Sequence, residues 1–540
     1  MFFSYGTMYF SSYDLHGSDL MSPELIHRRR WGILAVLCLS LFLAVVDNTI
    51  VNVALPTLSR SLGATTSQLQ WIVDAYALVF AALLLVGGSI GDRVGRKGAL
   101  QVGLLLFTGF SVYAATTTSA PQLIVARGLM GVGAALVFPA TLAILTNVFV
   151  DPVERAKAIG AWSAVVGLAV ALGPISGGIL LKHFWWGSIF LVNLPVAVIA
   201  FVLGALLVPS SKDPHTPPLD PAGIGLSIAA VGLLVFTTIQ APEHGWLSAR
   251  TIGGFVGALL LFGSFVLVES RSAHPMLDVS VFRNPRFSAA SASITSAFFA
   301  FFGFIFLITQ YFQFVRGYDT LSAGLHTLPF AVAAAITAPL SPRVAFVIGT
   351  KRTVSSGLLV MAIGFVISAT VGSSSSYWLH IVPSMVLLAI GLQLTTAPST
   401  DAILGSLPLE KAGVGSAIND TTRELGGTMG VAVIGSVFSS VYGPKVVRAL
   451  SNFPIPQEGV EAARKSMGAA MVVAERAPAA GRDLILSVAR GAFMSGMHVA
   501  CLVAAGVAFI GALTAFSYLP SQARRSPRGT LVDVAPVAGA

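Results

Sequence analysis

The sequence contains 540 residues, of which 55 % are hydrophobic and only 10 % are charged, and its mean hydropathy is +0.82. A soluble protein carries about 25 % charged residues, so this composition excludes a soluble enzyme and predicts an integral membrane protein. The formal net charge of +9 does not indicate a nucleic-acid partner, because the basic residues gather in short segments between hydrophobic runs, where they orient a chain in the bilayer.

Apolar runs of about 20 residues recur along the chain, and each is long enough to form a membrane-spanning helix. We therefore predict an all-α, multi-pass protein in the lipid bilayer with fourteen spans. Their expected positions are 31–54, 68–90, 98–117, 121–148, 157–181, 184–208, 221–240, 250–269, 287–312, 321–340, 353–372, 377–400, 411–441 and 490–518.

Two polar linkers divide these spans into groups of six, two and six. A Pro-rich linker follows the sixth span at 209–218, and a second linker follows the eighth span at 270–286. This 6+2+6 order suggests two six-helix bundles with an inserted helical pair. The predicted units are an N-terminal extension (1–30), a first bundle (31–208), the linkers with the inserted pair (209–286), a second bundle (287–518) and a tail (519–540).

Lys and Arg residues are concentrated on one side of the predicted spans, and that side is expected to be cytoplasmic. An even number of spans then leaves both termini in the cytoplasm. The other side has one long predicted loop, at 442–489. Its Ala-rich run at 459–476 has two interpretations, an amphipathic helix on the outer surface or a mobile loop.

Three charged residues are expected inside the membrane. Asp47 lies in the first span, Asp74 in the second and Arg127 in the fourth. A charge at this depth is costly, so its side chain should face the bundle interior or a water-filled path for ions or substrates. Because a nearby guanidinium favours an ionised carboxylate and desolvation disfavours it, such a group can act as a proton-binding switch. The alternatives are a structural salt bridge for Asp47, a helix cap for Asp74 and a purely structural bundle contact for Arg127.

The connection after the second span combines glycines with charges. Its residues are Gly88, Asp92, Arg93, Gly95, Arg96 and Lys97. The glycines permit a tight turn and close helix approach, and the acid can pair with an arginine. We predict a charged conformational latch at the cytoplasmic surface, as opposed to an ordinary basic loop.

The fifth span contains a proline among small residues. The residues concerned are Gly167, Gly173, Pro174, Gly177 and Gly178. A proline inside a helix frees a backbone carbonyl and bends the helix, and glycines allow close packing. The pattern predicts a pliant hinge, and the alternative is a kinked helix without a special role.

Polar residues open the thirteenth span, where Asp420, Arg423 and Glu424 share one helical face. We expect a local ion-pair cluster near the cytoplasmic mouth, with a second proton site as the alternative. The aromatic run at 298–306 covers more than one helix face, so its rings meet lipid, the central cavity or both.

The sequence contains no phosphate-binding Gly-x-x-x-x-Gly-Lys-Ser/Thr motif, no metal-ligand spacing and no nucleophile elbow. We therefore expect no cofactor and no metal. Without a nucleotide site, any energy that the protein needs is expected to come from the proton gradient across the membrane. A membrane sensor or an enzyme on a transporter scaffold is the non-transport alternative, but a sensor needs an output domain and an enzyme needs a clustered catalytic set.

The loop around Asp92 resembles the signature loop of the major facilitator superfamily. Five further stretches resemble motifs of its fourteen-helix drug:proton antiporters (EmrB/QacA type). They lie at 47–56, 70–76, 185–195, 310–313 (followed by Gly324 and Pro329) and 415–427. The glycine–proline pattern of the fifth span resembles the motif of the exporters of this superfamily, with Ala169 in place of one glycine.

The resemblance implies a proton-coupled efflux transporter for amphipathic, cationic compounds, working by alternating access as a monomer in the bacterial plasma membrane. It also implies roles in proton coupling and cation recognition for Asp47, Asp74 and Arg127. A dedicated exporter of one metabolite, antibiotic or lipid-like compound is the alternative within the transporters. The expected partners are small-molecule substrates and protons.

Overall fold

The computed structural model describes residues 22–212, 220–272, 275, 277, 279–406, 412–451, 453 and 455–519, and every regular element in these ranges is helical. The predicted N-terminal extension and tail lie largely outside the described residues, as does most of the Pro-rich linker. The N-terminal bundle consists of α1 (Pro23–Leu62), α2 (Thr66–Val94), α3 (Arg96–Thr116), α4 (Ala120–Val148), α5 (Pro152–His183), α6 (Ser188–Leu191) and α7 (Asn193–Leu207).

Two helices follow as the inserted pair, α8 (Pro221–His244) and α9 (Ala249–Arg271). The C-terminal bundle then begins. Its elements are η1 (Val279–Arg283), α10 (Pro285–Gln310), η2 (Tyr311–Val315), α11 (Thr320–Leu325), α12 (Leu328–Thr337), α13 (Ser341–Ile348), α14 (Thr350–Ser368), η3 (Tyr377–Ile381), α15 (Val382–Leu404), α16 (Ala412–Leu450), α17 (Gln457–Lys465), α18 (Met467–Arg476) and α19 (Ala479–Tyr518).

Thirteen helical segments of the described chain are long and apolar enough to cross a membrane. They include α6 with α7, and α11 with α12, each pair counted as one segment. The 32-residue helix α5 lies beside α1 in the N-terminal bundle and supplies a fourteenth. The predicted all-helical membrane fold is therefore confirmed.

Polar side chains at the helix starts explain several boundaries. Thr65 and Gln68 form a reciprocal capping box that begins α2, and the side chain of Asp220 accepts a hydrogen bond from the first turn of α8. Gly95 has a φ of 126° and forms the turn between α2 and α3, a conformation that a residue with a Cβ rarely adopts.

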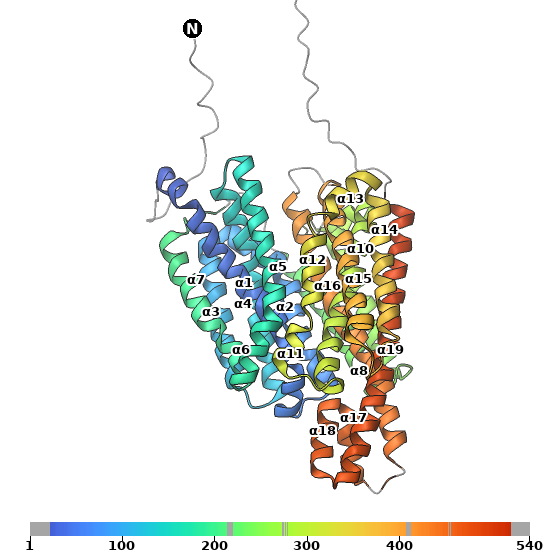
Figure 1. Ribbon diagram of the computed structural model, residues 1–540. Helices are drawn as coiled ribbons and strands as arrows, with labels where there is room; N and C mark the ends of the chain where they lie inside the picture. The colour runs from blue at the N-terminus through green and yellow to red at the C-terminus, as the bar shows by residue number, and fades with distance from the viewer. Residues whose placement is uncertain are drawn as a thin grey trace, which may run out of the picture.

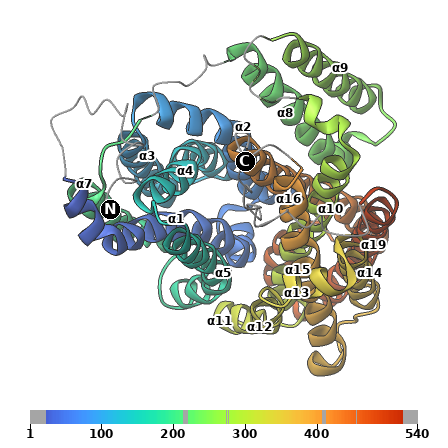
Figure 2. The same ribbon diagram turned by 90° about the horizontal axis from the view of Figure 1, so that it is seen from above.

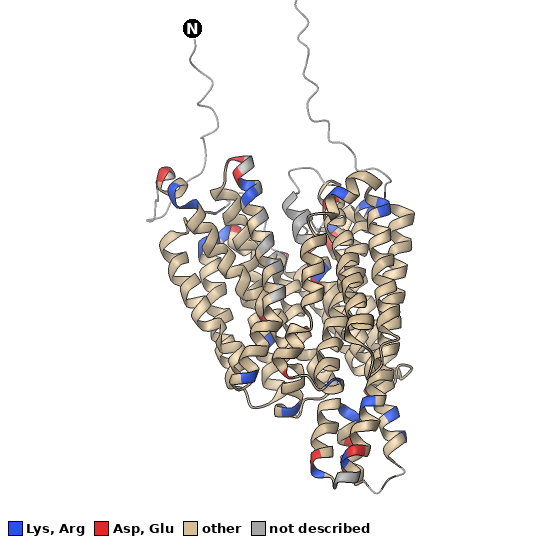
Figure 3. Cartoon of the chain, in the orientation of Figure 1, with Lys and Arg blue, Asp and Glu red and all other residues tan. Residues whose placement is uncertain are grey.

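The two bundles stand side by side, and the inserted pair lies at their edge (Figures 1 and 2). Helix α8 contacts both α2 and α16, whereas α9 packs mainly on α8. The first turn of α1 and the last turn of α19 lie at the same end of the molecule, while α17 and α18 project from the opposite end. Most Lys and Arg residues lie near the two ends of the helices (Figure 3).

Most of the stretch predicted as a loop at 442–489 is helical. Helix α16 continues to Leu450, and α19 begins at Ala479. For the run at 459–476, the structure agrees with the helical interpretation and not with the mobile loop. The run forms two helices, α17 and α18, which are separated at Ser466. The Ser466 side chain accepts a hydrogen bond from the backbone N–H of Ala469 and so begins the second of them.

Hydrogen bonds between the two bundles gather at the end that carries α17 and α18. The side chain of Thr309 donates to the carbonyl of Asn52 at 3.0 Å, and that of Gln313 donates to the carbonyl of Val53 at 2.8 Å. The hydroxyls of Ser59 and Ser466 lie 3.1 Å apart. At the other end, the helices of the two bundles diverge (Figure 1). The bundles are thus closed against each other at the end opposite the first turn of α1 and the last turn of α19.

Candidate functional site

A fully buried ion pair joins two helices of the N-terminal bundle. Asp47 of α1 and Arg127 of α4 both have no exposed surface, and Nη1 of the arginine donates to Oδ2 of the carboxylate. Arg127 also donates from Nε to the carbonyl of Ile72 at 3.1 Å, and its guanidinium lies 4.3 Å above the ring of Tyr76. A guanidinium stays charged when it is buried, so these contacts offset the free-energy cost of removing the Arg127 charge from water.

The other oxygen of the Asp47 carboxylate is held from a different side. The side-chain amide of Asn193, the first residue of α7, donates to Oδ1 at 2.8 Å. The same amide nitrogen donates to the hydroxyl of Ser111 of α3 at 2.9 Å, and that hydroxyl donates to the carbonyl of Phe190 at 2.9 Å. The carboxylate is therefore bonded directly to α4 and α7, and α3 and α6 are linked to it through Asn193 and Ser111.

Sequence reasoning did not assign a role to Ser111 or Asn193. Asn193 lies in the stretch 185–195, which resembles a motif of the drug:proton antiporters. A polar amide at the start of an apolar helix could have marked it as a functional residue. Ser111 gave no signal, because a single serine in an apolar span is common as a small packing residue.

Asp74 lies on α2, apart from this network. Its side chain is fully buried, and neither carboxylate oxygen has a hydrogen-bond partner among the described residues. It is in the third turn of α2, which Thr65 caps, so the helix-cap interpretation of Asp74 is wrong. One turn before it, the amide of Gln70 donates to the carbonyl of Ala432 in α16 at 2.9 Å. Asp74 therefore lies near the seam between α2 and the C-terminal bundle.

The acids and base at the start of α16 form a loose cluster. Arg423 lies 3.9 Å from the carboxylate of Asp420, donates to the hydroxyl of Thr400 at 3.1 Å and lies 5.5 Å from the ring centroid of Phe298. The charge of Glu424 is close enough to act on Tyr76 of α2. This cluster therefore lies across the seam from the Asp47–Arg127 pair.

The predicted latch residues tie the α2–α3 connection to its own bundle. Arg96 donates from Nε to the carboxylate of Asp92 at 2.7 Å, and Lys97 donates to the carbonyl of Ala205 at the end of α7 at 2.9 Å. Gly88 faces Pro139 of α4, where an added Cβ would be in ordinary van der Waals contact. Arg93 also has a partner in the structure.

The small residues predicted as a hinge lie at close helix contacts. A Cβ on Gly177 would come within 2.7 Å of the Ile50 side chain, and one on Gly178 within 2.6 Å of the Leu321 backbone. Gly173 faces Thr49 of α1, and the carbonyl of Pro174 faces Gly324 of the other bundle. Helix α5 thus uses these residues to approach both α1 and the C-terminal bundle. Gly167 lies in the same helix.

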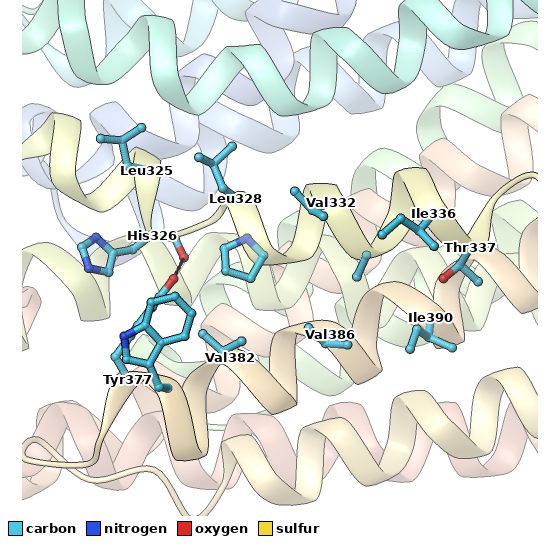
Figure 4. A pocket seen from close by; sticks show the side chains of 13 residues that line it. Leu325, His326, Leu328, Val332, Ile336, Thr337, Tyr377, Val382, Val386 and Ile390 are labelled. Atoms are coloured by element: carbon cyan, nitrogen blue, oxygen red, sulfur yellow. Dashed lines mark hydrogen bonds between the residues drawn. The ribbon is translucent and has the colours of Figure 1, made fainter.

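A groove of about 700 Å³ runs between α12 and α15 (Figure 4). Its wall is formed mainly by aliphatic side chains, including Val332, Val382 and Val386, and the Tyr377 hydroxyl at one end donates to the carbonyl of His326 at 3.0 Å. Val332 and Ile336 are more than half exposed, so the groove opens on the outer face of the bundle. A smaller cavity of about 230 Å³ lies between α1, α5 and α7, beside Asn193. No group of three or more His, Cys, Asp or Glu side chains in the described ranges is placed to hold a metal ion.

Two helical bundles that are closed at one end, with a buried ion pair in one bundle and a facing acid in the other, define a membrane transporter of the alternating-access class. The family model of the Major Facilitator Superfamily matches residues 37–431. The chain belongs to this superfamily and is a secondary transporter, not an enzyme.

The chain is similar to several bacterial proteins over nearly its whole length. It is 37 % identical to the multidrug efflux pump LfrA of Mycolicibacterium smegmatis, covering 88 % of this chain and 94 % of that protein. It is 33 % identical to the methyl viologen resistance protein SmvA of Salmonella typhimurium (92 % and 100 % covered). It is 32 % identical to the tetracenomycin C resistance and export protein of Streptomyces glaucescens (90 % and 91 %).

Solved structures share the fold at lower identity. A bacterial homologue of the human lysosomal transporter Spinster, in an inward-facing and unoccupied conformation, superposes with a TM-score of 0.61 at 17 % identity, covering 92 % of this chain and 99 % of that one. The POT family transporter PepTSo also gives a TM-score of 0.61, at 16 % identity, covering 92 % and 98 %.

Proposed function

We propose that this protein is a drug:proton antiporter that exports amphipathic, cationic compounds by alternating access. The observation that carries the proposal is the fully buried Asp47–Arg127 pair, a charge arrangement that costs free energy in a membrane protein and is retained where ions or substrates move. The names of the relatives, which include a multidrug efflux pump and a methyl viologen resistance protein, support this substrate class.

The proposed topology places both termini in the cytoplasm of a bacterial cell, with the protein in the plasma membrane. The excess of Lys and Arg in the short connections on one side of the predicted spans supports this orientation. With that orientation, the closed end of the bundles faces outward, and the conformation described is open toward the cytoplasm. We propose that a monomer carries out the cycle, because a single chain contains both bundles and all three buried charged residues, Asp47, Asp74 and Arg127.

In the proposed cycle, the cytoplasm-facing state binds the substrate and the outward-facing state binds the proton. Protonation of Asp47 removes the negative partner of Arg127, so the bundle contacts organised by the ion pair rearrange when the proton arrives. A membrane potential of 100 mV supplies about 2.3 kcal/mol per charge moved, which drives the exchange without a nucleotide.

Asp74 is the second proposed proton carrier. An ionised carboxylate that is buried without a hydrogen-bond partner is costly, so the conformation described is stable with a proton on this group. The ion pair of Asp47 favours the opposite protonation state. In the conformation described, Asp74 is thus the site suited to a bound proton, and Asp47 is the site suited to an ionised carboxylate.

A dedicated exporter of one natural product is the second candidate. The similarity to the tetracenomycin C resistance and export protein favours it specifically, because that relative is matched over nearly its full length. Both candidates use the same proton site, and they differ in how many substrates the cavity accepts.

The test uses inside-out membrane vesicles with an imposed proton gradient and ethidium as the substrate. Wild-type protein should accumulate ethidium and release protons in a gradient-dependent way, and Asp47→Asn should lose both activities while remaining inserted. If folded wild-type protein moves no organic cation, the multidrug proposal is wrong, and a panel of neutral and anionic natural products tests the second candidate. If Asp47→Asn transports normally, the ion pair is structural.

A further inference from the structure

The hydrogen bonds around Asp47 have a fixed direction. The carbonyl of Phe190 can only accept, so the hydroxyl of Ser111, 2.9 Å away, must donate to it. The same hydroxyl therefore receives a hydrogen bond from Asn193, whose amide nitrogen lies 2.9 Å away. The chain of bonds begins at a backbone group that no change of pH can alter.

This direction determines which end of the Asn193 amide faces Asp47. The nitrogen bonded to Ser111 is also the atom 2.8 Å from Oδ1 of Asp47, so both amide hydrogens are used as donors. In the reversed orientation, the amide oxygen of Asn193 would face the carboxylate of Asp47, and neither oxygen could donate to the other. The amide oxygen would also need the hydroxyl hydrogen of Ser111, which is already donated to the carbonyl of Phe190. Oδ1 is therefore held as a hydrogen-bond acceptor.

The consequence concerns where a proton can bind. A proton on Oδ1 would point at the Asn193 N–H group, and Asn193 could accept it only by reversing its amide and breaking two buried hydrogen bonds. Oδ2 faces Nη1 of Arg127, which donates to this oxygen as long as Oδ2 itself carries no proton. A proton that arrives at Oδ2 replaces the ion pair.

We propose that Asn193, oriented by Ser111, is a positioning residue that directs the transported proton to Oδ2 of Asp47 and so couples protonation to release of Arg127. The proposal rests on the proposed proton-coupled function. Without Asn193, either oxygen could take the proton, and half of the binding events would leave the contact with Arg127 in place. Asn193 and Ser111 are both almost fully buried, at 2 % and 0 % exposure.

Few other titratable groups face this site. Arg127 comes from α4, Tyr76 from α2 and Glu424 from α16, whose charge reaches Tyr76. Asp74 is on α2 and is not bonded to the network. On α3, Tyr113 is two residues from Ser111 and is 42 % exposed. Helices α6 and α7 contain no titratable residue, α5 has none between Lys157 and Lys182, and α10 has none between Arg286 and its end at Gln310.

The experiment measures ethidium export and proton release in proteoliposomes as a function of pH, for wild type, Asn193→Ala, Ser111→Ala and Gln101→Ala. Gln101 is a matched control, because its amide also joins α3 to α7, donating to the carbonyl of Phe201 at 3.2 Å without touching Asp47. In parallel, infrared difference spectra of purified protein follow the C=O band of protonated Asp47, defined by its loss in Asp47→Asn.

Loss of the Asn193 donor makes the ionised carboxylate less favourable, so the pH midpoint of the Asp47 band and of transport should rise by about one to two pH units in Asn193→Ala. Ser111→Ala should shift the midpoint in the same direction by less, because the donor remains but its orientation is released. Gln101→Ala should keep the wild-type midpoint. Proton release per exported ethidium should rise in Asn193→Ala, since some protons then bind and cross without separating Arg127 and therefore without export.

An unchanged midpoint and an unchanged proton-to-ethidium ratio in folded Asn193→Ala would overturn the proposal. If Asn193→Ala does not fold, Ser111→Ala decides, and a wild-type midpoint in that variant counts against the proposal. Wild-type protein that shows no proton-linked transport and no titrating Asp47 band would instead refute the proposed function itself, so the two failures are distinguishable.

Discussion

The ammonium group of Lys182, near the end of α5, lies 3.2 Å from the carboxylate of Asp319, which caps α11, so one ion pair spans the two bundles at their closed end. The backbone N–H of Ser322 donates to this carboxylate at 2.7 Å. The hydrogen bond from Ser322 and then Lys182 lower the pKa of Asp319. The pair therefore contributes to closure only while Asp319 is ionised.

Because the pKa of Asp319 is lowered in the closed state, its contribution is fully present at neutral pH and is lost as the pH falls below about 4, the ordinary range of an aspartate. We expect closure to be constant between about pH 5 and 8 and to weaken below that range, by about twofold, because both side chains are half exposed. The measurement is alkylation of Thr320→Cys by a membrane-impermeant maleimide, with Cys38 and Cys501 replaced by Ala.

Lys182→Met should remove most of this acid response and leave alkylation faster at neutral pH. A response that is identical in Lys182→Met would show that another group controls closure in acid.

A second prediction concerns the hydroxyls of Ser59 and Ser466, which lie 3.1 Å apart across the bundles. In the same background without Cys38 and Cys501, the double variant Ser59→Cys with Ser466→Cys should form a disulfide under mild oxidation. The cross-link should stop ethidium export, because α1 can no longer separate from α18, and reduction should restore it. The single variants are the controls. Continued export by the cross-linked protein would mean that this end does not open during transport.

A third prediction uses Gly178, where a Cβ would lie 2.6 Å from the Cα of Leu321 and 2.8 Å from the carbonyl oxygen of Thr320. Both neighbours are backbone atoms of the other bundle, so Gly178→Ala should disfavour closure and raise the alkylation rate of Thr320→Cys. Gly506→Ala is the matched control, because no atom lies within 4 Å of the added Cβ in α19. Equal alkylation rates in the two variants would exclude a tight contact at Gly178.

A fourth prediction separates the two buried acids by thermal stability in detergent. Asp47→Asn leaves Arg127 buried without its anion, so the variant should lose about 3–5 kcal/mol of stability and show a clearly lower Tm. Asp74→Asn removes no hydrogen bond or ion pair of the described structure, so its Tm should stay close to that of wild type. Because both variants replace a buried aspartate by asparagine, the difference between their Tm values reports the loss of the ion pair and not the chemical change of the side chain. A large loss of stability in Asp74→Asn would reveal a partner for that carboxylate.

Several features of the fold were predictable from local sequence. Prolines inside the tenth and twelfth spans, Pro329 and Pro398, are local signals for a helix break. Pro329 does occupy the first turn of α12, after the break from α11, whereas α15 continues through Pro398. The latch charges Asp92 and Arg96 are four residues apart, a spacing at which side chains on a helix meet, and they do form an ion pair.

Other features could not be read in this way. The sequence placed Asp47, Asp74 and Arg127 inside the membrane without indicating which acid pairs with the arginine. In the described structure Asp47 is paired with Arg127, and Asp74 has no hydrogen-bond partner. The contact of Ser466 with Ser59 joins residues 407 positions apart, and no local pattern marks either serine.

The sequence by itself determined that this is a helical, multi-pass membrane protein with charges placed inside the bilayer. These properties depend on stretches of about 20 residues and on the cost of exposing polar groups to lipid, which are local quantities. Only the tertiary structure decided that Asn193 and Ser111 hold one oxygen of Asp47 while Arg127 holds the other. The partners of a buried polar group depend on which distant helices pack together, and that depends on the shape of the whole bundle.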